Sequence, residues 1–140
     1  MARYVAEIAL ALACGLAFFV FADYDAARLY SLANTLATVA GVLFGFLLTA
    51  IAMMVSLPER RLVANMRLTG HYSVLMKGTL RACGVHFAAL IVSLVAVFSA
   101  GKFLEVAVSL ALAAEALAIM RTAQAGQRFW RVLEVLEHSD

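Results

Sequence analysis

The stretch LYSLANTLATVAGVLFGFLLTAIAMMVSLP, residues 29–58, contains no Asp, Glu, Lys or Arg, and it decides the class of this protein. A membrane-spanning helix needs about 20 consecutive, mostly apolar residues, and this stretch exceeds that length. A second uncharged stretch runs from Ala82 to Gly101. Helices are the expected structure for both, because lipid cannot satisfy open backbone groups.

The composition of the whole chain agrees with a membrane protein. Of its 140 residues, 65% are hydrophobic and 14% are charged, whereas a soluble domain is about 45–50% apolar and about 25% charged. Two further stretches are apolar apart from Glu7 in one and Glu105 and Glu115 in the other. We therefore predict an all-α, four-transmembrane-helix bundle with spans at about residues 4–22, 30–57, 82–100 and 104–120.

The basic residues are distributed unevenly around these spans, which predicts the topology. Positive residues favour the cytoplasmic side of a membrane. Two basic residues, Arg28 and Lys102, would lie outside, and nine would lie on the side of the termini. We expect a bacterial inner-membrane protein with both termini in the cytoplasm. The nine residues are Arg3, Arg60, Arg61, Arg67, Lys77, Arg81, Arg121, Arg128 and Arg131.

The segments between the spans predict short helices and one tight turn. Ser56-Leu-Pro-Glu59 is typical of a helix start and Gly70 of a helix end, so residues 58–81 are expected to form a short cytoplasmic helical hairpin. A turn at Gly101-Lys102 makes the last two spans antiparallel neighbours. After Gly126 the chain is expected to form a separate C-terminal amphipathic helix. The predicted domains are thus a transmembrane domain, 1–122, and a cytoplasmic C-terminal helix, 123–140.

Small residues recur every four positions along the second span, and Gly41-Val-Leu-Phe-Gly45 is a G-x-x-x-G motif. Such spacing lets helix backbones approach closely in a membrane. The contact lies either within one subunit or between subunits, and the sequence leaves both interpretations open. The candidate packing residues are Ala37, Gly41, Gly45 and Thr49.

Three ionisable residues, Glu7, His86 and Glu115, lie inside the predicted spans at a similar depth on the cytoplasmic side. An ionisable group in lipid is expensive unless it is paired, so it is a candidate functional residue. The tight turn predicts that His86 and Glu115 meet. They form either a structural pair or a polar layer along an ion or proton path.

Two charged surfaces flank the membrane. The carboxylates Asp23 and Asp25 at the outer loop either cap a helix or gather cations at a pore mouth. The basic inner segment is a candidate surface for a cytoplasmic protein partner, through Arg60, Arg61, Arg67, Lys77 and Arg81.

No enzyme motif is present, including H-E-x-x-H, G-x-S-x-G, a phosphate loop or a dinucleotide fingerprint. Cys14 and Cys83 lack metal-ligand spacing and are expected to be small packing residues. We expect no cofactor, no metal and no direct contact with nucleic acid.

The segments Gly41-Val-Leu-Phe-Gly-Phe-Leu-Leu-Thr-Ala50 and Leu68-Thr-Gly-His-Tyr72 resemble small four-span proteins of bacterial anti-phage defence operons. These include the membrane subunit of Kiwa-type systems and the channel effector of Hailong-type systems. The resemblance covers roughly residues 41–81. It implies a homo-oligomeric membrane assembly that is controlled by a cytoplasmic partner.

Together these features predict a homo-oligomer in the lipid bilayer, most simply a tetramer. It would act as a gated ion channel or membrane-disrupting effector in anti-phage defence. The alternative is a non-conducting membrane anchor or sensor that recruits a soluble partner through its basic loop.

Overall fold

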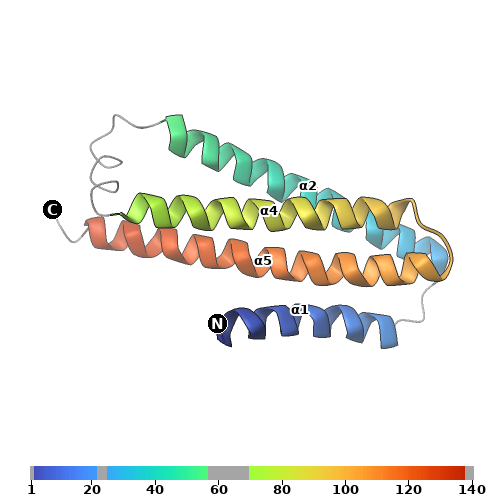
Figure 1. Ribbon diagram of the computed structural model, residues 1–140. Coiled ribbons are helices and arrows are strands. Elements are labelled where there is room, and N and C mark those ends of the chain that lie inside the picture. Colours follow the sequence, from blue (N-terminus) through green and yellow to red (C-terminus); the bar gives the residue numbers. More distant parts are fainter. Residues whose placement is uncertain (1, 22–24, 57–69, 138–140) are drawn as a thin grey trace.

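The computed structural model describes residues 2–21, 25–56 and 70–137, and within these ranges the chain forms helices joined by short turns (Figure 1). Three helices contain segments long and apolar enough to cross a membrane, namely Ala26–Ser56, Tyr72–Val97 and Lys102–Arg131, whereas the apolar helix Val5–Phe21 is shorter. The predicted all-α class is confirmed. The helices are α1 (Ala2–Phe21), α2 (Ala26–Ser56), α4 (His71–Val97) and α5 (Lys102–Glu137).

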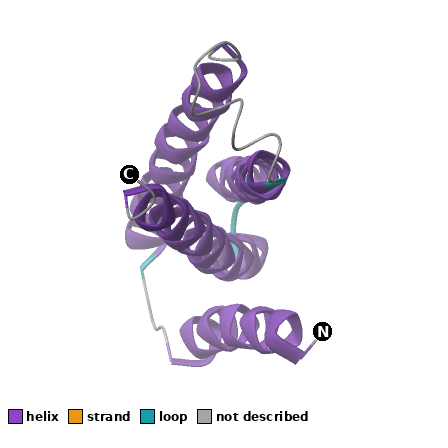
Figure 2. Cartoon of the chain, turned by 90° about the vertical axis from the view of Figure 1, so that its left-hand side faces the viewer, coloured by secondary structure: helices purple, strands orange, loops and turns teal. Residues whose placement is uncertain are grey.

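Helix α5 is the centre of the arrangement. It packs against α1, α2 and α4, and α2 also packs against α4. Seen along the helices in Figure 2, α1 and α2 lie on opposite sides of α5, and among the described residues α1 packs against α5 alone. Helix α1 begins and α5 ends at the same end of the molecule, which we call the termini end, and the α4–α5 turn marks the opposite turn end (Figure 1).

The tight turn between α4 and α5 occurs where the sequence predicts it. Gly101 has a φ of 60°, a left-handed conformation that glycine adopts readily, and its carbonyl accepts a hydrogen bond from the Leu104 N–H at 3.0 Å. The Tyr30 hydroxyl on α2 donates to the Ser99 carbonyl at 2.7 Å. Two hydrogen bonds therefore fix the turn end, one within the turn and one from α2.

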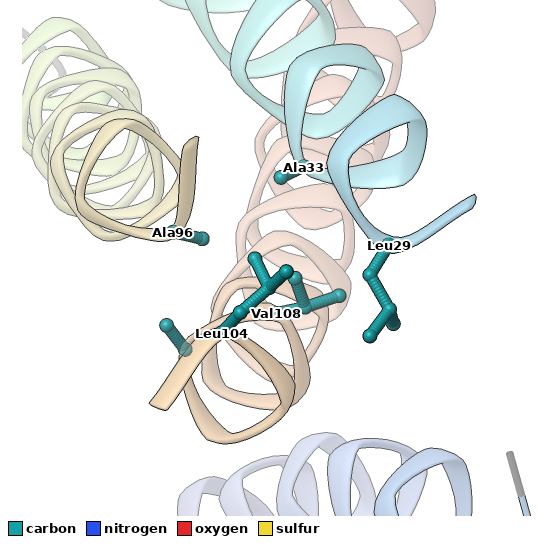
Figure 3. Close-up of a cluster of buried hydrophobic side chains, with 6 residues drawn as sticks. Leu29, Ala33, Ala96, Leu104 and Val108 are labelled. Carbon is teal, nitrogen blue, oxygen red and sulfur yellow. The ribbon is translucent and has the colours of Figure 1, made fainter. Parts of the chain in front are cut away.

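The core between α2, α4 and α5 consists mainly of alanine and a few larger side chains (Figure 3). Ala33 from α2 and Ala96 from α4 are both fully buried, and they lie near Val108 and Leu104 of α5. Small side chains let the helix backbones approach closely, which is how membrane helices gain packing energy. A second cluster, nearer the termini end, contains Leu47, Ala82 and Cys83.

One expected local feature differs from the structure, and a second lies partly outside the described residues. Helix α5 continues through Gly126 to Glu137, so residues 123–137 extend the last helix rather than forming a separate one. One glycine costs a helix only about 1 kcal/mol relative to alanine, and the flanking residues are good helix formers. The second half of the predicted hairpin is also the start of α4, which begins at His71. Residues 57–69, which hold the first half, lie outside the described residues.

Candidate functional site

Of the three ionisable residues predicted to form a polar layer, Glu115 lies on α5, and the other two contact the same segment of α5, residues 115–124, from α4 and α1. His86 on α4 lies beside Glu115 and Thr122, and Glu7 on α1 lies beside Arg121 and Gln124. Polar side chains thus occupy two sides of α5, one facing α4 and the other facing α1.

On the side facing α4, His86 and Glu115 form a deeply buried pair. His86 is 0% exposed and Glu115 is 4% exposed. His86 Nδ1 lies 3.7 Å from Glu115 Oε1, and His86 Nε2 forms a hydrogen bond of 2.9 Å with Thr122 Oγ1. The predicted proximity of His86 and Glu115 is therefore present, and Thr122 is an additional partner that spacing alone did not reveal.

On the side facing α1, Glu7 joins two helices that are far apart in the sequence. Gln124 Nε2 donates a hydrogen bond of 2.7 Å to Glu7 Oε1, and Arg121 Nη2 lies 3.2 Å from Glu7 Oε2. Sequence reasoning missed Gln124 and did not pair Arg121 with Glu7. The available signal was the spacing of Arg121 and Gln124, which places both on one face of a helix.

Among the described glycines, Gly15 on α1 has tighter surroundings than Gly41 and Gly45 of the G-x-x-x-G motif on α2. A Cβ atom at Gly15 would lie 2.6 Å from the Ser109 carbonyl oxygen and 3.0 Å from the Ala113 Cβ atom. An apolar groove of about 560 Å³ runs along this α1–α5 contact, and its lining includes Gly15 itself, Phe19 and Val106.

The predicted packing stripe on α2 divides between the core and the outside. Ala37 is buried, and a Cβ at Gly41 would lie 3.8 Å from Leu90 Cδ1, which is ordinary contact. Gly45 and Thr49 are exposed, and a Cβ at Gly45 would meet nothing within 4 Å. The second half of this stripe therefore faces away from the described core.

Helix α2 carries a longer stripe on its outward side, which we call the α2 polar stripe. Its positions are three or four residues apart, as one face of a helix requires, and each holds Ser, Asn, Thr, Gly or Ala. All are exposed except Gly41, which is half-buried. At 1.5 Å per residue the stripe is about 37 Å long, enough to cross a membrane. It comprises Ser31, Asn34, Thr38, Gly41, Gly45, Thr49, Ala52 and Ser56.

The hydroxyl groups of the α2 polar stripe are arranged alike. Thr38, Thr49 and Ser56 each donate to the carbonyl four residues earlier, at 2.8, 3.0 and 2.8 Å. Each donor is satisfied inside the helix, so lone pairs on the hydroxyl oxygen remain to accept from outside. At 3.6 residues per turn these hydroxyls form a line, and the glycines lie about 30–70° to one side of it.

The remaining predicted sites lie at the two ends of the molecule. Asp25 immediately precedes α2, and its carbonyl accepts hydrogen bonds from the Arg28 and Leu29 N–H groups at 3.0 and 3.2 Å. Asp25 thus occupies the cap position of α2. Lys77 and Arg81 are exposed on α4 near the termini end. Asp23, Arg60, Arg61 and Arg67 lie outside the described residues.

The side chains of the site offer limited chemistry. The described residues contain no group of three or more His, Cys, Asp or Glu side chains that could hold a metal ion. What they offer is a buried pair of titratable side chains at His86 and Glu115, an ion pair at Glu7 and Arg121, and a line of hydroxyls on α2. No protein-family model, curated protein or solved structure matches this chain.

Proposed function

We propose that this chain assembles as a homo-oligomer in the bacterial inner membrane and forms a gated ion channel whose pore is lined by α2. The α2 polar stripe is the observation that supports the proposal. Other exposed helix faces carry large apolar side chains suited to lipid, such as Phe87 and Ile91 on α4. Facing lipid, the exposed amide of Asn34 would have no partner for its donors and acceptors, and this is costly in a membrane.

The hydroxyl-bearing residues and the glycines of the α2 polar stripe have different roles in this assembly. The hydroxyls of Thr38 and Thr49 face the pore, where their lone pairs replace part of the water around a passing ion. Gly41 and Gly45, to one side of that line, let neighbouring copies of α2 approach closely. Four copies around an axis provide the simplest closed pore.

Conductance provides the direct test of this function. Purified full-length protein in planar bilayers should give unitary ionic currents. Thr49→Leu should reduce the current without changing the mass of the assembly, because the larger side chain narrows the pore. A control, Leu48→Ala, alters the neighbouring residue at the same depth on another face. Silent bilayers containing a correctly assembled wild type would contradict the proposal.

The topology of the channel follows from the basic residues. We propose that the termini end lies in the cytoplasm, with nine basic residues on that side and two on the other. Single cysteines at Asp25 and Arg67 can be labelled in intact cells. An impermeant reagent added outside should label only the cysteine at position 25. Labelling of the cysteine at position 67 would contradict this orientation.

A second candidate function is a non-conducting anchor for a cytoplasmic protein. Helix α5 is 36 residues long, or about 54 Å, and a bilayer core is about 30 Å thick. Its end therefore extends beyond the core, and exposed basic residues lie in the same part of the molecule, namely Lys77, Arg81 and Arg131. Recruitment of a partner without any current would favour this candidate.

We also propose that the assembly acts in anti-phage defence, as the resemblance of residues 41–50 and 68–72 implies. Expression with its neighbouring genes should lower the plating efficiency of phage, and Thr49→Leu should abolish this protection. Equal plating with and without the wild-type gene would contradict the defence role and leave the conductance test unaffected.

A further inference from the structure

The His86–Glu115 pair contains buried polar atoms that have no hydrogen-bond partner. Both oxygens of Glu115 and Nδ1 of His86 are buried without a hydrogen-bond partner. Polar atoms enclosed in this way are costly, and natural proteins satisfy nearly all of them. Two of these atoms, His86 Nδ1 and Glu115 Oε1, lie 3.7 Å apart.

We propose that His86 and Glu115 together bind one exchangeable proton, held between His86 Nδ1 and Glu115 Oε1 inside the α4–α5 contact. The proton is the ligand that makes the two side chains complementary. This inference goes beyond the channel proposal, because it holds whether or not the assembly conducts.

The partners of the imidazole determine where this proton lies. His86 Nε2 lies 2.9 Å from Thr122 Oγ1, and in the proposed tautomer Nε2 carries a proton and donates to the threonine oxygen. Nδ1 is then an acceptor whose lone pair receives no hydrogen bond. A carboxylic acid at Glu115 supplies the missing donor. A movement of about 0.5–1 Å brings the two atoms from 3.7 Å to hydrogen-bonding distance.

Transfer of the proton within the pair leaves the charge balance unchanged. When Glu115 holds it, both side chains are neutral. When it moves to Nδ1, an imidazolium lies beside a carboxylate, and the net charge is still zero. Loss of the proton from the pair leaves one net negative charge in the low-dielectric contact between α4 and α5.

Among the described residues, no basic side chain other than His86 is paired with Glu115 to compensate for that charge. Arg121 on α5 is directed to Glu7 on α1, at 3.2 Å. On α4, Lys77 and Arg81 are exposed. On α2, the charged residue in the described helix is Arg28, at the turn end. A proton is therefore the counter-ion that the surroundings of the pair require.

Release of the proton should accompany entry of water between α4 and α5. The uncompensated carboxylate needs solvation, and both side chains are enclosed in the present conformation. The pair thus couples its own protonation to separation of these two helices.

Infrared spectroscopy of the full-length protein in lipid tests the proposal. A glutamate side chain in water is ionised at about pH 7. The wild type at that pH should nevertheless show the carbonyl stretching band of a protonated carboxylic acid. Glu115→Gln should remove the band. Glu105→Gln, a matched control at an exposed position of the same helix, should leave it in place.

Two further measurements keep the test decisive. In wild-type protein the band should shift on transfer to D₂O, since the proton is exchangeable. If Glu115→Gln does not fold, Glu115→Asp should move the band rather than remove it. A wild type without an acid band near neutral pH, or a band that survives Glu115→Gln, would overturn the proposal.

Discussion

The packed face and the outward face of α2 both carry small side chains, but they differ in what lies against them. On the packed face, Ala33 and Ala40 are completely buried. On the outward face, a Cβ atom at Gly45 would meet nothing within 4 Å. Hydroxyl and amide groups occur there where the packed face has alanine. Small size alone explains the packed face. The hydroxyls of the outward face donate within the helix, but the exposed amide of Asn34 needs a polar neighbour, which we propose is pore water.

The largest expected effect compares one enlargement on each face. Ala40→Leu inserts a branched side chain into a filled site, so the subunit should lose about 1–3 kcal/mol of stability. Thermal unfolding in detergent measures this loss. Gly45→Leu should leave the unfolding temperature unchanged and should separate the subunits, as native mass spectrometry can show. An unchanged oligomer mass in Gly45→Leu would remove this glycine from the subunit contact.

An intermediate result is expected at Gly41. A side chain there makes ordinary contact with Leu90 of the same subunit and also lies at the edge of the outward face. Gly41→Leu should therefore weaken the oligomer and slightly lower the stability of the subunit. This variant locates the boundary between the two faces.

The fold and part of the candidate site could be predicted from the sequence, for identifiable reasons. The absence of charge between Leu29 and Pro58 indicated a helix, and the short connection at Gly101 made α4 and α5 neighbours. The depth of His86 and Glu115 then followed from counting residues outward from that turn. Local chain geometry was sufficient for these features.

Features that depend on packing between distant segments were missed. The spacing of Arg121 and Gln124 places both on one helix face, but no short connection joins α1 to α5, so spacing did not identify Glu7 as their partner. The α2 polar stripe is visible in the sequence as residues at helical spacing. Its outward orientation, however, depends on which side of α2 packs against α4. The break expected at Gly126 was wrong, because the flanking residues keep α5 helical.

The contact of α1 with α5 provides a second test of packed small residues. Gly15→Leu should push α1 away, because even its Cβ would lie 2.6 Å from the Ser109 carbonyl oxygen. Hydrogen exchange of the α1 backbone should become faster than in the wild type. Ala13→Leu, which extends into the open groove on the same helix, is the matched control. Equal exchange in both variants would contradict a tight contact at Gly15.

A smaller effect is expected at the buried pair. Glu115→Gln keeps the size and the hydrogen-bonding capacity of the side chain, so expression and assembly should stay near those of the wild type. The conductance should change, because the pair no longer exchanges a proton as α4 and α5 separate. Glu105→Gln, at an exposed position, should conduct normally. If Glu115→Gln is silent in both conductance and defence activity, the pair has a structural role at most.

Water accessibility along α2 tests the central claim most directly. In a background with Cys14→Ser and Cys83→Ala, single cysteines replace Thr38 and Thr49 on the polar stripe and Val39 and Leu48 beside them. Each pair lies at nearly the same depth but on different faces of the helix. A water-soluble thiol reagent should modify the cysteines at positions 38 and 49 and block the current, while those at 39 and 48 stay unmodified. If none of the four cysteines is modified by the reagent, water does not reach the α2 polar stripe, and this result would contradict the pore.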